Sequence, residues 1–150
     1  SVIKSVIKSN ENRSSLLLKI VFEILNGKVK NKKICFLGVT FKANTDDMRD
    51  SSSLSMIPSL IKKGAKVNYF DPTGEKDDFK KLKNVYFSND INSAVRESDL
   101  IIIHTEWNDF KSINFKKVVK SKKFVIFDMR NVYSPLKMKE QKIKYFAIGR

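Results

Sequence analysis

The chain has 150 residues, of which 41% are hydrophobic and 31% charged. This fits one globular domain with a buried core and excludes a disordered tail, a coiled coil or a collagen-like chain. Its apolar runs fall far short of the roughly 20 residues of a membrane span, and no secretion signal is recognisable. The single cysteine, Cys35, excludes an internal disulfide and a cysteine-rich metal site, so we expect a cytoplasmic protein with no membrane or metal partner.

The chain is strongly basic, with 30 lysine and arginine residues against 16 aspartate and glutamate residues, a formal net charge of +14. Such an excess can serve nucleic-acid binding, or it can lie on a solvated surface. It is mostly lysine spread along the chain, and no arginine-rich run or aromatic-and-basic signature accompanies it. We therefore expect no nucleic-acid partner. A freestanding basic binding module stays an alternative, and an anionic small molecule stays open.

Residues 2–26 are predicted to form a long helix. Apolar residues recur there at spacings of three and four, and Gly27 stands where a helix would end. The polar interval 9–15 interrupts this apolar pattern. It is either a break in the helix or a stretch that faces another part of the protein.

From Lys32 onward, short apolar runs alternate with amphipathic segments. The runs predict strands at 34–38, 67–70, 85–87, 100–103, 124–127 and 145–148. Helices are predicted at 54–61 before Gly64, from Ser88 or Asp90 through Val95, and from Ser134-Pro135 onward. Pro58 contradicts the first of these helices unless it lies near the first turn.

Strands that alternate with helices at this spacing indicate crossover units and a mostly parallel sheet of about six strands. The predicted fold class is therefore α/β, Rossmann-like and doubly wound. In such sheets, ligands bind beyond the carboxyl ends of the strands. Four segments occupy that position, namely residues 38–53, 71–72, 104–110 and 128–133.

The loop after the first predicted strand is the most informative segment. A dinucleotide-binding turn would read Gly-x-Gly-x-x-Gly there, but only Gly38 is present. The loop instead carries two cations, Lys42 and Arg49, on either side of an acidic pair. The two cations either meet an anionic ligand or pair with the neighbouring aspartates, and the sequence leaves both interpretations open.

A third cation, Arg130, follows the fifth predicted strand. Because the carboxyl ends of parallel strands meet at one edge, Lys42, Arg49 and Arg130 are expected to converge there. Lysine and arginine are the side chains that bind phosphate oxygens best. The sequence therefore predicts an anionic, phosphorylated ligand at this edge of the sheet.

The other polar residues at these strand ends favour structural roles. Asp71 is expected to form a turn rather than to bind a ribose. His104 is the only histidine, so it has no partner for a zinc site and is expected to be a structural polar residue. Trp107 and Phe110 are expected to close the core or an interface, and Cys35 is expected to be inert. No catalytic residue is predicted.

Four motifs carry a family resemblance: Phe41-Lys42-Ala-Asn-Thr-Asp-Asp-Met-Arg49-Asp-Ser, Tyr69-Phe-Asp-Pro72, Thr105-Glu-Trp-Asn-Asp-Phe110 and Asp128-Met-Arg-Asn131. In this order and spacing they resemble the carboxyl-terminal, UDP-binding domain of the UDP-glucose 6-dehydrogenases, within the UDP-glucose/GDP-mannose dehydrogenase family. Residues 6–12 resemble the late part of that family's long central helix.

The resemblance implies an NAD-dependent oxidation of UDP-glucose to UDP-glucuronate through a thiohemiacetal on a cysteine. It implies that Phe41, Lys42 and Arg130 contact the UDP-sugar, and that Arg49 reaches the NAD of a companion domain. Residues 1–30 would be the end of the connecting, dimerisation helix and residues 31–150 the UDP-sugar-binding domain. A homodimer or higher homo-oligomer is also implied.

Two features of the family have no counterpart in these residues: the NAD-binding domain and the cysteine motif, which Cys35 does not match. We therefore expect a fragment that does not turn over substrate alone. Ala43 and Ser52 stand where prolines are common in the family, which bears on loop stiffness. Dehydrogenases of GDP-mannose or UDP-N-acetylhexosamines share the architecture, so the sugar nucleotide stays open between these and UDP-glucose.

Overall fold

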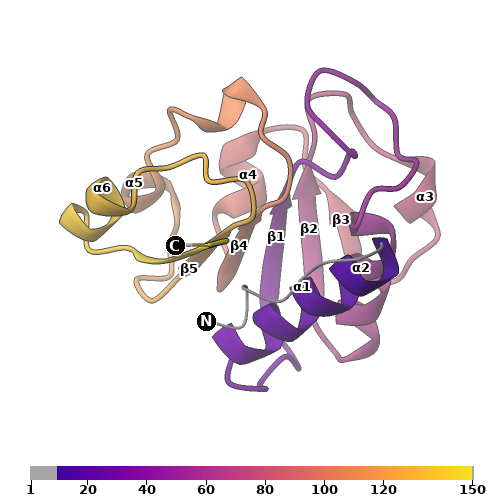
Figure 1. The fold of residues 1–150 in the computed structure, drawn as a ribbon, viewed down its shortest axis with the longest axis horizontal. Helices are drawn as coiled ribbons and strands as arrows, with labels where there is room; N and C mark the ends of the chain where they lie inside the picture. Colours follow the sequence, from indigo (N-terminus) through magenta and orange to yellow (C-terminus); the bar gives the residue numbers. More distant parts are fainter. Residues whose placement is uncertain (1–9, 150) are drawn as a thin grey trace.

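A computed structural model gives the fold of the chain and describes residues 10–149. Its centre is a six-stranded, all-parallel sheet in the order β3-β2-β1-β4-β5-β6 (Figure 1). The strands are β1 (Lys33–Leu37), β2 (Lys66–Phe70), β3 (Val85–Phe87), β4 (Leu100–Ile103), β5 (Val125–Asp128) and β6 (Lys144–Ala147). Each lies within one residue of its predicted bounds, and the predicted α/β, doubly wound class is confirmed.

The helices are α1 (Asn10–Ile24), α2 (Ser53–Lys62), α3 (Asp77–Lys80), α4 (Ile91–Val95), α5 (Phe115–Val118) and α6 (Pro135–Glu140), with a 3-10 turn, η2, at Asn108–Phe110. The short helices α3 and α5 were not predicted, because a single turn carries too little periodic pattern. Pro58 lies past the first turn of α2, where it removes a helical N–H. The helix continues through it, with Met56, Ile57 and Leu60 fully buried.

Successive residues of the central strands alternate between two cores. Ile34 and Phe36 of β1 pack in one core, and Cys35 and Leu37 pack in the other. The first core is covered by α1 and α2, which lie over one face of the sheet (Figure 1), and the second contains residues of α4, α5 and α6. This two-sided burial explains why the strands read as continuous apolar runs.

Helix α1 covers the described part of the helix predicted at 2–26, of which residues 1–9 lie outside the described residues. The helix ends at Ile24, and a left-handed turn follows in which the Gly27 N–H donates to the Phe22 carbonyl at 2.8 Å. Leu17 and Val21 are buried in the same core as the sheet. Helix α1 therefore packs as part of this fold.

Two absences apply to residues 10–149. None of the helices in this range is both long enough and apolar enough to cross a bilayer. Within the same range, histidine, cysteine, aspartate and glutamate side chains nowhere form a group of three that could hold a metal ion.

Candidate functional site

A cavity of about 390 Å³ opens at the carboxyl edge of the sheet. Helix α1, the loop after β1, the end of β4 and the loop after β5 each contribute to its wall. The lining residues, called the cavity wall below, are Arg13, Ser14, Phe41, Lys42, Asp50, Ser52, His104 and Arg130. The structure thus brings together Phe41, Lys42 and Arg130, the three residues for which the sequence predicts contact with the ligand.

Arg130 is the most constrained cation of the cavity wall. Its Nε donates to the His104 carbonyl at 3.1 Å, and its Nη2 donates to the Phe41 carbonyl at 2.9 Å. Burial, together with the charge of Arg13, lowers the pKa of the Arg130 guanidinium. None of the ion pairs found in residues 10–149 includes Arg130. Its guanidinium is therefore held by two neutral carbonyls, and among the described residues the nearby Glu106 favours its charged form without forming an ion pair with it.

The loop that carries Phe41 and Lys42 is anchored by its own hydroxyls. The Thr40 hydroxyl donates to the Lys42 carbonyl at 2.9 Å, while the Ser51 and Ser53 hydroxyls donate to the Val39 carbonyl at 2.5 and 2.6 Å. Phe41 is 45% exposed. An aromatic ring this accessible can pack against a sugar or a base.

Asp71 also anchors this loop, from the end of β2. One carboxylate oxygen accepts the Val39 N–H at 2.9 Å. The other accepts both the N–H and the hydroxyl of Thr73, at 2.9 and 2.6 Å. The predicted turn-forming role is confirmed, because these bonds hold both the Asp71 turn and the start of the loop.

Gly38 lets two strand ends approach each other closely. It has a φ of +78°, and a Cβ placed on it would lie 2.6 Å from Cβ of Thr105. The space beside the first strand end is therefore filled by a side chain of the chain itself. The loop after β1 also lacks the further glycines of a dinucleotide-binding turn.

His104 is buried, with 1% of its surface exposed, yet its ring lines the cavity. Its Nδ1 lies 2.9 Å from the Thr105 hydroxyl and its Nε2 lies 2.9 Å from the Ser52 hydroxyl. Burial lowers the pKa of His104 to about 3, and the charges of Arg130 and Arg13 act in the same direction. The ring is therefore neutral near pH 7, as a structural histidine should be.

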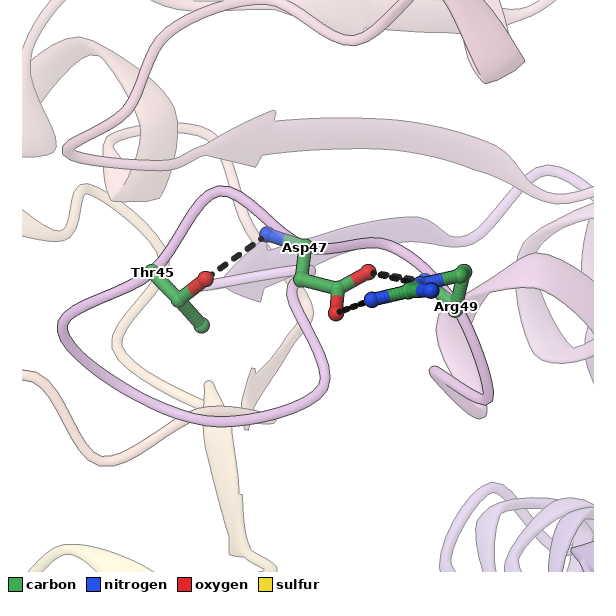
Figure 2. Close-up of polar contacts among 3 residues, drawn as sticks. All are labelled: Thr45, Asp47 and Arg49. Carbon is green, nitrogen blue, oxygen red and sulfur yellow. Dashed lines mark hydrogen bonds and ion pairs between the residues drawn. The ribbon is translucent and has the colours of Figure 1, made fainter.

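Arg49 lies outside the cavity wall. Its side chain is 88% exposed, and its Nε and Nη2 donate to the two carboxylate oxygens of Asp47 at 3.0 and 2.9 Å (Figure 2). Hydrogen bonds from Arg49 lower the pKa of Asp47 to about 2. Of the two interpretations left open for the loop cations, pairing with a neighbouring aspartate describes Arg49. Lys42 instead lines the cavity.

Sequence reasoning missed Arg13, which reaches the cavity from helix α1. The polar interval 9–15 was the available signal, because Arg13 and Ser14 belong to it and both face the cavity. Only the packing of α1 on α2 places that interval beside the strand ends. Asp50, Ser52 and His104 also join the wall without having been predicted as ligand contacts.

Residues 35–135 match the model of the UDP-glucose/GDP-mannose dehydrogenase family, UDP binding domain. The chain belongs to this family. The resemblance carried by the four sequence motifs is thereby confirmed. The matched range contains every residue of the cavity wall except Arg13 and Ser14 of α1.

Curated relatives of this dehydrogenase family cover nearly the whole chain. It is 36% identical over 151 residues to a UDP-glucose 6-dehydrogenase of Rickettsia felis and 37% identical over 153 residues to one of Rickettsia conorii. These matches cover 99% of this chain but 34% and 35% of the relatives. The chain therefore spans about a third of the length of the curated relatives that it matches.

A solved dehydrogenase shares the fold. The crystal structure of an NDP-N-acetyl-D-galactosaminuronic acid dehydrogenase from Methanosarcina mazei Go1 superposes with a TM-score of 0.76. The match has 24% sequence identity and covers 98% of this chain and 33% of that chain. At this identity the likeness establishes the fold alone.

Proposed function

We propose that this chain is the nucleotide-sugar-binding part of an NAD-dependent UDP-glucose 6-dehydrogenase, which oxidises UDP-glucose to UDP-glucuronate. The observation that carries the proposal is the single cavity wall on which Phe41, Lys42 and Arg130 meet. The relatives named UDP-glucose 6-dehydrogenase support the choice of sugar nucleotide.

The charges of the cavity wall suit a nucleoside diphosphate. Among the described residues that line the cavity, Arg13, Lys42 and Arg130 present three cations, and Asp50 is the one carboxylate. A diphosphate carries negative oxygens that charged N–H donors bind more strongly than neutral ones do. We assign the diphosphate to these cations, with Lys42 near the uridine ribose and the Phe41 ring against the nucleotide sugar.

The hydride transfer belongs to NAD, for which the loop after β1 lacks the glycine-rich binding turn. NAD accepts the hydride when it is bound by the companion domain, and this chain contributes the exposed side chain of Arg49 toward it. Residues 1–30 belong to the connecting helix in this proposal, and residues 31–150 form the sugar-nucleotide domain of a homo-oligomer. The chain alone should release no NADH from UDP-glucose and NAD, as an absorbance assay would test.

Calorimetric titration of the 150-residue chain tests the substrate. UDP and UDP-glucose should bind more tightly than GDP or a UDP-N-acetylhexosamine. Tighter binding of GDP would move the assignment to a GDP-mannose dehydrogenase, and tighter binding of the acetylated sugar would move it to that class.

Lys42→Ala tests whether the cavity wall holds the ligand. This variant should weaken UDP-glucose binding by about 1–3 kcal/mol, because a charge-assisted hydrogen bond is lost. Lys122→Ala is the matched control, since Lys122 is exposed and lies outside the cavity wall. If both variants bound UDP-glucose like the original chain, a freestanding basic module would be the better description.

A further inference from the structure

Three consecutive serines at the start of α2 are used in two different ways. The hydroxyls of Ser51 and Ser53 both donate to the Val39 carbonyl and so fasten the loop after β1. Ser52 occupies the N-cap position of α2, yet its side chain makes no capping hydrogen bond. A capping serine accepts a hydrogen bond from a backbone N–H of the first turn and so stabilises the helix. The Ser52 hydroxyl forgoes this contribution and lies instead on the cavity wall, 2.9 Å from Nε2 of His104.

The protons of this hydrogen-bond chain can be assigned in sequence. The Thr40 carbonyl can only accept, so the Thr105 hydroxyl donates to it, at 2.9 Å. Because its one proton is donated to the Thr40 carbonyl, the Thr105 hydroxyl must accept a hydrogen bond from the Nδ1–H of His104. A neutral imidazole has a single N–H, so its Nε2 is an acceptor and the Ser52 hydroxyl donates to it.

The chain is held rigidly at its buried end. The Thr105 side chain lies against Gly38, where no Cβ could be accommodated, and Thr105 is fully buried. The backbone carbonyl of His104 accepts from Nε of Arg130, which fixes the residue from the other side. The Thr105 hydroxyl and the His104 backbone are therefore fixed, and both ring nitrogens of His104 lie 2.9 Å from a hydroxyl.

We propose that Ser52 Oγ is a fixed hydrogen-bond acceptor of the cavity, which binds an O–H or N–H donor on the nucleotide sugar. This inference rests on the proposed function. With its proton committed to His104, the oxygen offers only lone pairs to the ligand. The cations of the cavity wall bind oxygens of an anion, whereas Ser52 recognises a group that a bare anion lacks. The cations and the Ser52 oxygen together thus select a hydroxyl-bearing nucleotide over an anion without a proton, such as sulfate.

The proton assignment can be measured directly, because His104 is the only histidine of the chain. In a ¹⁵N-labelled sample at neutral pH, long-range ¹H–¹⁵N spectra should show Nδ1 protonated and Nε2 unprotonated. The opposite tautomer would overturn the inference, because the Ser52 hydroxyl would then be free to donate.

The ligand contact is measured by titrating variants of the 150-residue chain. Ser52→Ala should weaken UDP-glucose binding by about 3- to 10-fold, the effect of one hydrogen bond. Sulfate, which carries no proton at neutral pH, should compete for the cavity of Ser52→Ala as it does for the original. Ser52→Thr keeps the hydroxyl and should restore the affinity for UDP-glucose. Ser55→Ala is the control, since within the described residues the exposed Ser55 hydroxyl donates only to the Ser52 carbonyl.

The outcomes separate the inference from the function on which it rests. If the original chain binds UDP-glucose and Ser52→Ala binds it equally well, the contact at Ser52 is wrong and the proposed function stands. If Ser52→Ala weakens sulfate and UDP-glucose alike, Ser52 serves only the shape of the cavity, and the inference again fails. If the original chain binds neither UDP nor UDP-glucose, the proposed function fails and the ligand contact falls with it.

Discussion

The tripeptide Asp-Met-Arg occurs twice at the ligand edge of the sheet, at 47–49 and at 128–130, and its two copies behave differently. In both copies, the backbone N–H of the arginine donates to Oδ1 of the aspartate at 3.0 Å. At 47–49 the guanidinium also pairs with the carboxylate, at the surface of the molecule (Figure 2). At 128–130 it turns away, to the carbonyls of His104 and Phe41.

The environment of the aspartate accounts for the difference. Asp128 ends β5 and is fully buried, and its Oδ2 accepts from the Tyr133 N–H and the Tyr145 hydroxyl. These neutral donors occupy Oδ2, and among the described residues the Arg130 guanidinium forms no ion pair with Asp128. Asp47 has no such donors on Oδ2 other than the Arg49 guanidinium among the described residues. An identical local sequence thus gives a neutralised surface pair in one place and, in the other, a cation that lines the cavity and that the proposed function assigns to the diphosphate.

The largest expected effect separates the two regions by pH. His104, beside Arg130, has a pKa of about 3 in the folded state against 6.5 when unfolded. Between pH 6.5 and pH 3, His104 is therefore protonated in the unfolded chain but not in the folded chain. The free energy of unfolding falls as the pH drops through this range. The loss reaches at most roughly 5 kcal/mol. Urea unfolding between pH 7 and pH 4 should show it, and His104→Gln should remove that part of the slope.

The exposed pair offers the contrast. The pKa of Asp47 is lowered from 3.8 to about 2. Its contribution to folding stability is therefore fully present above pH 3.8 and is lost as the pH falls toward 2. Solvent screens such a pair, and Arg49→Ala should leave the pH profile of unfolding close to the original. Equal slopes for the original chain and His104→Gln would contradict the account of the buried region.

A smaller effect is expected from changing each aspartate of the two tripeptides to asparagine. Asp128→Asn replaces an acceptor oxygen with an NH₂ group that faces hydrogen-bond donors, in a fully buried position. It should reduce the free energy of unfolding by roughly 2–4 kcal/mol. Asp47→Asn should leave the melting temperature nearly unchanged. A similar loss of stability in both variants would show that burial does not distinguish the two copies.

The sequence predicts the sheet well, because strands buried on both faces read as continuous apolar runs. From the sheet it follows that Lys42 and Arg130 share one edge, since parallel strands end there together. The sequence cannot predict that Arg130 lines the cavity while Arg49 pairs with an aspartate, because the two arginines have the same local sequence and differ only in their tertiary partners. The place of Arg13 in the cavity wall cannot be predicted for a related reason, because it depends on how α1 packs.

The pair of variants Arg130→Ala and Arg49→Ala tests the central claim most directly, by titration of each with UDP-glucose in the absence of NAD. Arg130→Ala should weaken binding by about 10- to 100-fold, because the proposed function assigns this partly buried charge to the diphosphate. Arg49→Ala should bind within about 2-fold of the original, because an exposed ion pair contributes little. Melting curves verify that both variants are folded. Unchanged binding by Arg130→Ala, or an equal loss in both variants, would contradict the account.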